Sequence, residues 1–212
     1  MEVVAVGSSG VMRDDVHRLR RRPDGLRDIV VFTSLLAVFD HAAGRRFVRE
    51  LAAAFPDRTI RLQVKAPFRG RETADAFVEA CTRGLANIVY AESNLVELIE
   101  CSGYAFSDPS TVVIECLQFG VPSFMIDVLD FHRTCFYRDF PDLCVASADR
   151  AIERIRAIES GTWRYPRETF DGVIDLSGRV ALDVIREGMG LAPLEAPCRE
   201  ATRRHGGVDA RG

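Results

Sequence analysis

Residues 107–127, SDPSTVVIECLQFGVPSFMID, carry the pattern that decides the fold of this chain. The polar turn SDPST precedes the apolar run VVIECLQF, whose spacing is helical, and Gly120 and Pro122 interrupt that pattern. A second apolar run, VPSFMID, has the length of a buried strand. The stretch therefore predicts a helix and a strand joined by a tight turn, with one acidic residue, Glu115, inside the apolar part of the helix.

Short apolar runs alternate with helical patterns along the rest of the chain. Strands are expected at residues 3–7, 28–34, 59–65, 87–92 and 143–147, and the strand YAFSD leads into the opening stretch. Helices are expected at residues 14–22, 47–55, 73–83, 95–101, 150–158 and 170–189. This alternation is typical of βαβ units and predicts an α/β fold, with a parallel sheet covered by helices on both faces.

Length and composition limit the classes of protein to which the chain can belong. With 212 residues, of which 47% are hydrophobic and 28% charged, it can bury a sizeable core. We expect one domain over residues 1–190 and a disordered tail over 191–212, which is poor in apolar residues. The net charge of −3 provides no basic field for nucleic acid, and no apolar run reaches the length of a membrane span. Because the start also lacks the order of a signal peptide, we expect a cytoplasmic protein that meets a membrane only through a partner.

The spacing of cysteines and histidines gives no support for metal chemistry. The six cysteines form no CxxC pair, and the four histidines form no HxH or HExxH motif. Most of the cysteines lie in apolar surroundings, which is typical of small buried side chains in a reducing compartment. We therefore expect no metal site and no cofactor.

The loops that follow the strands are the candidate ligand-binding segments, because open α/β sheets bind ligands at the carboxyl ends of their strands. In the loop at residues 107–111, Ser107 or Asp108 can cap the helix that follows. Ser110 and Thr111 add hydroxyl donors, and the N-terminus of a helix favours an anion such as phosphate. The local pattern fits a plain helix cap equally well.

Two charged residues suit a bound nucleotide. Glu115 lies one turn beyond Thr111 on the same helix face, where a carboxylate can accept the hydroxyls of a ribose. The alternative is an ordinary surface charge. Lys65 is the only lysine in the chain and ends a strand, so it either neutralises a diphosphate or is solvated.

The segment VLDFHRTCFYRDF, which begins after Asp127, is a possible substrate loop. Asp127, Asp130 and His132 lie at its start, and its length and its mixture of aromatic and charged residues suit a binding loop. A structural histidine that closes a surface loop fits the pattern equally well. No Ser-His-Asp order and no nucleophile elbow is present, so the sequence identifies no catalytic residue.

The motif DPSTVVIECLQFGVP resembles the nucleotide-binding motif in the C-terminal domain of GT-B glycosyltransferases, above all bacterial surface-polysaccharide and glycerophosphotransferase-like members. The order of other segments is similar as well: VVAVGSSGVMRDDVHRL, VVFTSLLAVFD, a strand that ends in VKAP, and NIVYAESNLVELIECSGYAFSDPST. The resemblance covers residues 1–187. It implies a Rossmann-like, doubly wound parallel sheet that forms a single GT-B-type C-terminal domain with a C-terminal helix.

The resemblance also implies a set of residues around a donor nucleotide. These are Ser34, Leu35, Lys65, Glu92, Ser93, Asn94, Ser110, Thr111 and Glu115. Glu115 would hold the ribose, Ser110 and Thr111 the pyrophosphate, and Lys65 would assist the diphosphate. Residues 92–94 would border the base, and residues 34–35 would lie in the loop under the donor. The partner would be a nucleotide-diphosphate sugar, and the chemistry would need no metal.

The sequence departs from the family in three ways. Ala66 and Pro67 stand where many relatives have His-Pro, and the first loop lacks a glycine-rich stretch. GT-B enzymes also have two Rossmann-like domains with the site between them, and the first domain has no counterpart here. We therefore expect the donor-binding half of a glycosyltransferase, unable to transfer by itself, that works with an N-terminal-half partner chain or as a homo-oligomer.

Other interpretations of the missing half stay open. The chain can be a fragment, one subunit of a split enzyme, or a non-catalytic GT-B remnant that acts as a binding or interaction protein. A second related class is a sugar-nucleotide 2-epimerase-like protein. The usual motif of that class carries Gly-Gly and paired glutamates, whereas this chain has Ser-Thr and one glutamate.

Overall fold

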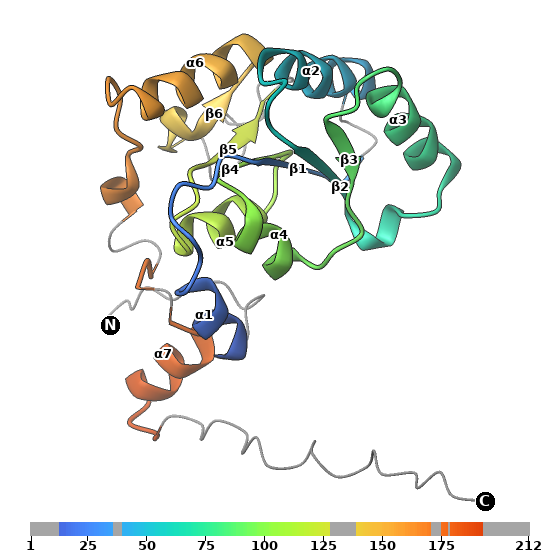
Figure 1. Ribbon diagram of the computed structural model, residues 1–212. Coiled ribbons are helices and arrows are strands. Elements are labelled where there is room, and N and C mark those ends of the chain that lie inside the picture. The colour runs from blue at the N-terminus through green and yellow to red at the C-terminus, as the bar shows by residue number, and fades with distance from the viewer. Residues whose placement is uncertain (1–12, 36–39, 128–138, 171–174, 178, 193–212) are drawn as a thin grey trace, which may run out of the picture.

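The computed structural model describes residues 13–35, 40–127, 139–170, 175–177 and 179–192. Its centre is a sheet of six parallel strands in the order β3-β2-β1-β4-β5-β6 (Figure 1). The strands are β1 (Ile29–Thr33), β2 (Ile60–Val64), β3 (Ile88–Tyr90), β4 (Tyr104–Ser107), β5 (Ser123–Ile126) and β6 (Cys144–Val145). The prediction of a doubly wound, Rossmann-like parallel sheet is confirmed.

Helices cover both faces of the sheet (Figure 1). The helices α2 (His41–Ala54), α3 (Glu72–Thr82) and α6 (Ala148–Glu159) pack on one face, and α4 (Leu95–Cys101) and α5 (Val112–Gln118) pack on the other. Beyond α4 and α5, α1 (Arg13–Leu19) lies beside α7 (Ala181–Gly188), and Arg20 donates a hydrogen bond to the carbonyl of Ser177. Within the described ranges, short 3₁₀ turns lie at Ala66–Phe68, Pro141–Leu143 and Arg167–Phe170.

The core consists of two apolar layers separated by the sheet. Every residue of β1 is buried, and its side chains alternate between the layers because successive strand residues point to opposite faces. Ile29 and Val31 pack under α2, α3 and α6, whereas Val30 and Phe32 pack under α1, α4 and α5. Burying one such side chain contributes about 1.5–3 kcal/mol, so the continuous apolar run of β1 makes it a central strand.

Most of the predicted elements are present, but several boundaries differ. The helix expected at residues 47–55 begins at His41, because the Asp40 carboxylate accepts a hydrogen bond of 2.9 Å from the Ala43 N–H and caps it. The strand expected at 143–147 is reduced to Cys144–Val145, because Ser147 caps α6. The strand expected at 3–7 and residues 193–212 of the expected tail lie outside the described residues.

The helix expected over residues 170–189 is present, among the described residues, only at Ala181–Gly188. Among the described residues of this segment, α7 is the one α-helix and covers eight residues. Just before it, Asp175 accepts from the Ser177 N–H at 2.8 Å, and the Ser177 hydroxyl accepts from the Arg179 N–H at 3.3 Å. Such local side-chain bonds offer the backbone an alternative to helical hydrogen bonds.

The strand order places a topological switch point between β1 and β4. From β1 the chain proceeds outward through β2 to β3, and from β4 it proceeds in the opposite direction through β5 to β6. The helices after the two strands, α2 and α5, therefore lie on opposite faces of the sheet (Figure 1). The loops at the carboxyl ends of β1 and β4 diverge, and in open α/β sheets the crevice between such loops is the usual ligand site.

Candidate functional site

A buried aspartate joins the two loops at the switch point. Oδ2 of Asp108, which follows β4, accepts hydrogen bonds from the Ser34 N–H at 2.5 Å and from the Ser34 hydroxyl at 2.6 Å. A longer contact of 3.4 Å comes from the Thr33 hydroxyl. Asp108 is 1% exposed and Ser34 is 2% exposed. Burial raises the pKa of Asp108, while the hydrogen bonds from Ser34 and the charge of Lys65 oppose that rise.

The expectation that Ser107 or Asp108 caps α5 is wrong. The residue at the cap position is Thr111, whose side chain makes no capping hydrogen bond. The Ser110 hydroxyl accepts a hydrogen bond of 3.2 Å from the Val112 N–H. Local spacing suggested a cap because Asp is a frequent capping residue, but the Asp108 carboxylate turns toward the loop after β1, 74 residues away in sequence.

The loop after β1 has an unusual backbone conformation at Leu35. Its φ is +49°, and it is the one residue other than glycine with positive φ among the described residues. Its N–H donates a hydrogen bond of 3.2 Å to the Thr33 hydroxyl, and its side chain is buried. Left-handed backbone costs a non-glycine residue about 1–2 kcal/mol, so the surrounding contacts must hold this loop in place.

Glu115 is buried rather than solvated. It lies one turn into α5, is 7% exposed, and its Oε1 is 3.5 Å from the Thr111 hydroxyl. The interpretation of Glu115 as an ordinary surface charge is therefore wrong. The helix α5 follows the carboxyl end of β4, so Glu115 lies on the helix that begins at one side of the switch point.

Lys65 follows β2 and lies next to the switch point. Its N–H donates a hydrogen bond of 2.9 Å to the carbonyl of Thr33, which continues the β1–β2 pairing beyond the strand ends. Its side chain is half-buried, and its charge acts on Asp108. The single lysine is thus brought to the same edge of the sheet as Ser34 and Asp108.

Residues Glu92, Ser93 and Asn94 form the exposed connection between β3 and α4. Two side chains, one in β2 and one just after the turn that follows β2, donate hydrogen bonds to the backbone of this connection. Gln63 donates to the carbonyl of Ser93 at 2.5 Å, and Arg69 donates to the carbonyl of Glu92 at 3.2 Å. Asn94 caps α4, because its side-chain oxygen accepts from the N–H at the third helical residue at 3.0 Å.

Sequence reasoning missed Gln63 and Arg69 as supports of this connection. Arg69 also donates to the carbonyl of Val64 at 2.9 Å, so one guanidinium bridges the ends of β2 and β3. A polar residue inside the apolar strand IRLQV was the available signal for Gln63. No local signal marks Arg69, because its partners are set by the pairing of two strands.

The predicted substrate loop is described only at its start. Asp127 follows β5, is 4% exposed, and donates its N–H to the carbonyl of Val145 at 2.9 Å. Asp130 and His132 lie outside the described residues. Within the described part of the chain, no group of three or more His, Cys, Asp or Glu side chains is close enough to hold a metal ion. Among those residues, no helix has both the length and the apolar character that crossing a bilayer requires.

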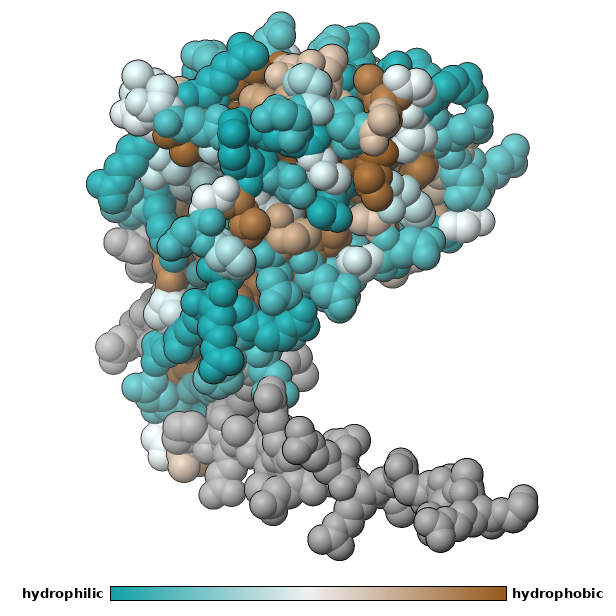
Figure 2. All heavy atoms as spheres, viewed as in Figure 1, coloured by the Kyte–Doolittle hydropathy of each residue, from teal (hydrophilic) through white to brown (hydrophobic). Residues whose placement is uncertain are grey.

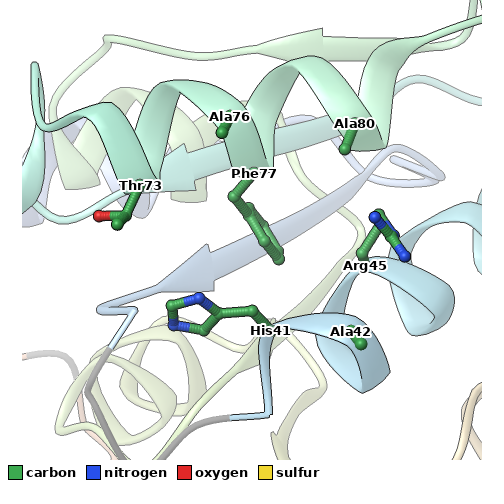
Figure 3. Close-up of a pocket in the computed structure, with 7 residues that line it drawn as sticks. All are labelled: His41, Ala42, Arg45, Thr73, Ala76, Phe77 and Ala80. Atoms are coloured by element: carbon green, nitrogen blue, oxygen red, sulfur yellow. The ribbon is translucent and has the colours of Figure 1, made fainter.

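A separate hollow lies in the helical layer between α2 and α3. It has a volume of about 390 Å³ and is lined by His41, Ala42, Arg45, Thr73, Ala76, Phe77 and Ala80. His41 and Arg45 face Phe77 across it (Figure 3), and hydrophobic residues reach the surface between these helices (Figure 2). None of the residues predicted to bind the donor lines this hollow. We place the candidate site at the switch point because buried polar side chains converge there.

Comparison with known proteins identifies the fold. The chain matches no model of a protein family and no curated protein. Among solved structures it is similar to a putative UDP-N-acetylglucosamine 2-epimerase from Listeria monocytogenes (TM-score 0.55, 12% identity, 87% of this chain and 49% of that one). It is also similar to UDP-GlcNAc 2-epimerase from Neisseria meningitidis bound to UDP-GlcNAc (TM-score 0.53, 13% identity, 84% and 49%).

A third similar structure is the wall teichoic acid polymerase TagF (TM-score 0.50, 13% identity, 84% of this chain and 48% of that one). At such identities the likeness concerns the fold, and the fold is the expected GT-B type of C-terminal domain. The chain spans about half the length of these solved structures.

Proposed function

We propose that this chain is the donor-binding half of a glycosyltransferase that uses a nucleotide-activated sugar or a nucleotide-activated alcohol. The observation that carries the proposal is the buried carboxylate of Glu115, 7% exposed, one turn into the helix that begins at the switch point. A carboxylate at this position of the helix could accept hydrogen bonds from the hydroxyls of a ribose, as acidic residues do in dinucleotide-binding folds.

Residues that follow β2, β3 and β4 have the chemistry that a nucleoside diphosphate requires. The hydroxyls of Ser110 and Thr111 precede the first turn of α5 and would donate to the pyrophosphate. Lys65, at the end of β2, would supply a positive charge to the same group. The exposed connection of residues 92–94 follows β3, two strands away from β1, and would border the base.

This arrangement would promote departure of the nucleoside diphosphate through fixed hydrogen-bond donors and one lysine, without a metal. The acceptor would come from a second half of the cleft, on a partner chain or on another copy of this chain. We therefore expect no transfer by this chain alone. Turnover of a nucleotide sugar by the purified chain would contradict that expectation.

Two other functions remain alternatives. The solved 2-epimerases and the polymerase are both similar in fold to this chain, so the fold alone does not distinguish epimerisation from transfer. A non-catalytic interaction protein is the other alternative, for which Leu182 and Ile185 of α7 and Met189 directly after it offer exposed apolar side chains. Light scattering with nucleotide titration separates these cases, because a stable oligomer that ignores nucleotide favours the interaction protein.

Calorimetric titration with UDP and with CDP tests the proposal directly. Glu115→Gln keeps the shape of the side chain but removes its charge, and charge-assisted hydrogen bonds contribute about 1.5–3 kcal/mol each. We therefore expect an affinity loss of about tenfold or more. The matched control is Glu79→Gln, which changes an exposed glutamate on α3 that pairs with Arg83 and should leave the affinity unchanged. Absence of binding to the wild-type chain, or equal binding by Glu115→Gln, would refute the assignment.

A further inference from the structure

The strongest feature outside the assigned donor contacts is the hydrogen bonding of Asp108. Both donors of Ser34, its N–H and its hydroxyl, bind the same oxygen of Asp108, at 2.5 and 2.6 Å. The N–H of Asp108 donates in turn to the carbonyl of Phe32 at 3.3 Å, so the two loops are joined through backbone and side chain. The second oxygen, Oδ1, is buried and has no hydrogen-bond partner among the residues that the structure describes.

Burying the carboxylate of Asp108 in this way is energetically unfavourable. A buried carboxylate is unfavourable unless several donors stabilise it, and the start of α5 would have offered Asp108 a solvated capping position. Instead, the charge lies between the loops after β1 and β4, on opposite sides of the switch point. Charge-assisted hydrogen bonds of this length are directional, so they fix the separation of the two loops as well as joining them.

The same contacts determine what the loop after β1 can offer a ligand. The N–H of Ser34 is taken by Asp108, and the N–H of Leu35 is taken by the Thr33 hydroxyl. Neither amide is available to a phosphate group, in contrast to a glycine-rich phosphate loop. Ser34 and Leu35 are therefore held in place by these hydrogen bonds, which also maintain the unusual φ of +49° at Leu35.

We propose that Asp108 is a positioning residue that holds Ser34 and Leu35, which follow β1, at a set distance from the start of α5, and so shapes the crevice for the diphosphate of the donor. This inference rests on the proposed function, since it concerns the same crevice. Asp108 acts through Ser34 rather than by touching the ligand, because both residues are at least 98% buried. Residues Ser110, Thr111 and Lys65 remain the groups that would meet the diphosphate.

Two variants and a matched control test the role. Asp108→Asn preserves the shape of the side chain but removes the charge, and Asp108→Ala removes the acceptor. The control is Ser107→Ala, because Ser107 precedes Asp108, is equally buried, and its hydroxyl has no hydrogen-bond partner among the described residues. Each variant is assayed by calorimetry with UDP and CDP and by hydrogen exchange of the Ser34 and Leu35 amides without ligand.

We expect both Asp108 variants to bind the nucleotide about tenfold more weakly or worse, and to exchange the Ser34 and Leu35 amides faster than wild type. Exchange of the β2 amides should stay unchanged, which separates a local release from global loss of stability. Ser34→Ala should weaken binding in the wild-type background but add nothing to Asp108→Ala, because two residues in one network are not additive. The Ser107→Ala control should resemble wild type in both assays.

Several outcomes would overturn the inference. If the amides of Ser34 and Leu35 exchange at wild-type rates in Asp108→Ala, Asp108 does not hold the loop. If they exchange faster while affinity for nucleotide stays the same, the loop is held but has no bearing on the ligand. If the wild-type chain binds nucleotide and the Asp108 variants bind it equally well, the positioning role fails while the proposed function stands. If the wild-type chain binds neither nucleotide, both fail.

Discussion

Gly103 precedes β4, and replacing it with alanine should be among the most damaging single changes in this protein. A Cβ built on Gly103 would lie 1.9 Å from the carbonyl oxygen of Leu26 and 2.6 Å from its carbon. Both atoms belong to the backbone, so no side chain can move aside. Because carbon contacts prefer about 3.5–4.0 Å, the two segments would have to separate by more than about 1 Å.

The expected cost follows from what that separation breaks. The N–H groups of Gly103 and Tyr104 both donate to the carbonyl of Asp28, at 2.8 and 3.2 Å, and would be pulled away from it. Each such hydrogen bond contributes about 1 kcal/mol, and overpacking of a tight contact adds about 1–3 kcal/mol. We expect Gly103→Ala to lower the free energy of unfolding by about 3–5 kcal/mol, out of a total of about 5–15 kcal/mol for a typical domain.

Urea unfolding followed by tryptophan fluorescence measures this change. The chain contains one tryptophan, Trp163, whose ring lies 6.4 Å from that of Phe124 in the core and therefore reports on tertiary packing. The binding assay adds a second readout, since β4 delivers Asp108 to the crevice and any shift of β4 against β1 displaces it. A cost below about 1 kcal/mol would refute the argument, because it would mean that the backbone relaxes freely at this point.

Two other glycines provide controls for Gly103→Ala. Gly84 has a φ of +74° and open space around its Cβ position, so Gly84→Ala isolates the cost of left-handed backbone, about 1–2 kcal/mol. Gly188 ends α7 and also has open space, so alanine there should be neutral or slightly stabilising. If all three variants lose the same stability, the steric contact at Gly103 is not the cause of its effect.

Two further predictions concern stability. Burial opposes ionisation of Glu159, but the hydrogen bond and charge of Arg58 outweigh burial and lower its pKa, so Glu159→Gln should cost about 1.5–3 kcal/mol at neutral pH. Because the folded-state pKa of Glu159 is the lower one, this contribution is complete above the ordinary carboxyl pKa of about 4.3 and is lost as the pH falls through the folded value. In urea titrations, the stability difference between the two proteins should therefore be smaller at pH 3 than at pH 7. Asn94→Ala removes the cap of α4 and should cost about 1 kcal/mol, whereas Asn94→Asp should retain most of the stability; equal losses in the two variants would argue against the capping role.

Much of the fold could be predicted from local pattern. The continuous apolar run of β1 and the helical spacing of α3 predicted elements that the structure confirms to within a residue at each end, whereas α2 begins six residues earlier than predicted. The segment before α7 could not be predicted in this way. Its apolar residues have helical spacing, but local hydrogen bonds from Asp175 and Ser177 stabilise a turn instead.

The assignment of the candidate site residues stays a prediction, but the structure shows where they lie. Lys65 and Ser110 follow the carboxyl ends of β2 and β4, and Glu115 lies one turn into the helix after β4. Local pattern favoured Glu115 as a surface charge, because an isolated glutamate in a helix is usually solvated. Its burial depends on how α5 packs, which the spacing of one helix does not determine.

The sequence by itself determined which segments form strands and helices, because side-chain period and turn residues act over a few positions. Only the tertiary structure decided which strands are neighbours. β1 pairs with β4 across more than 70 residues, and that pairing brings Asp108 to Ser34 and Gly103 to Leu26. The physical reason is that strand pairing depends on non-local packing between two apolar layers. Local pattern predicts that a residue will be buried, but it does not predict which residues will pack against it.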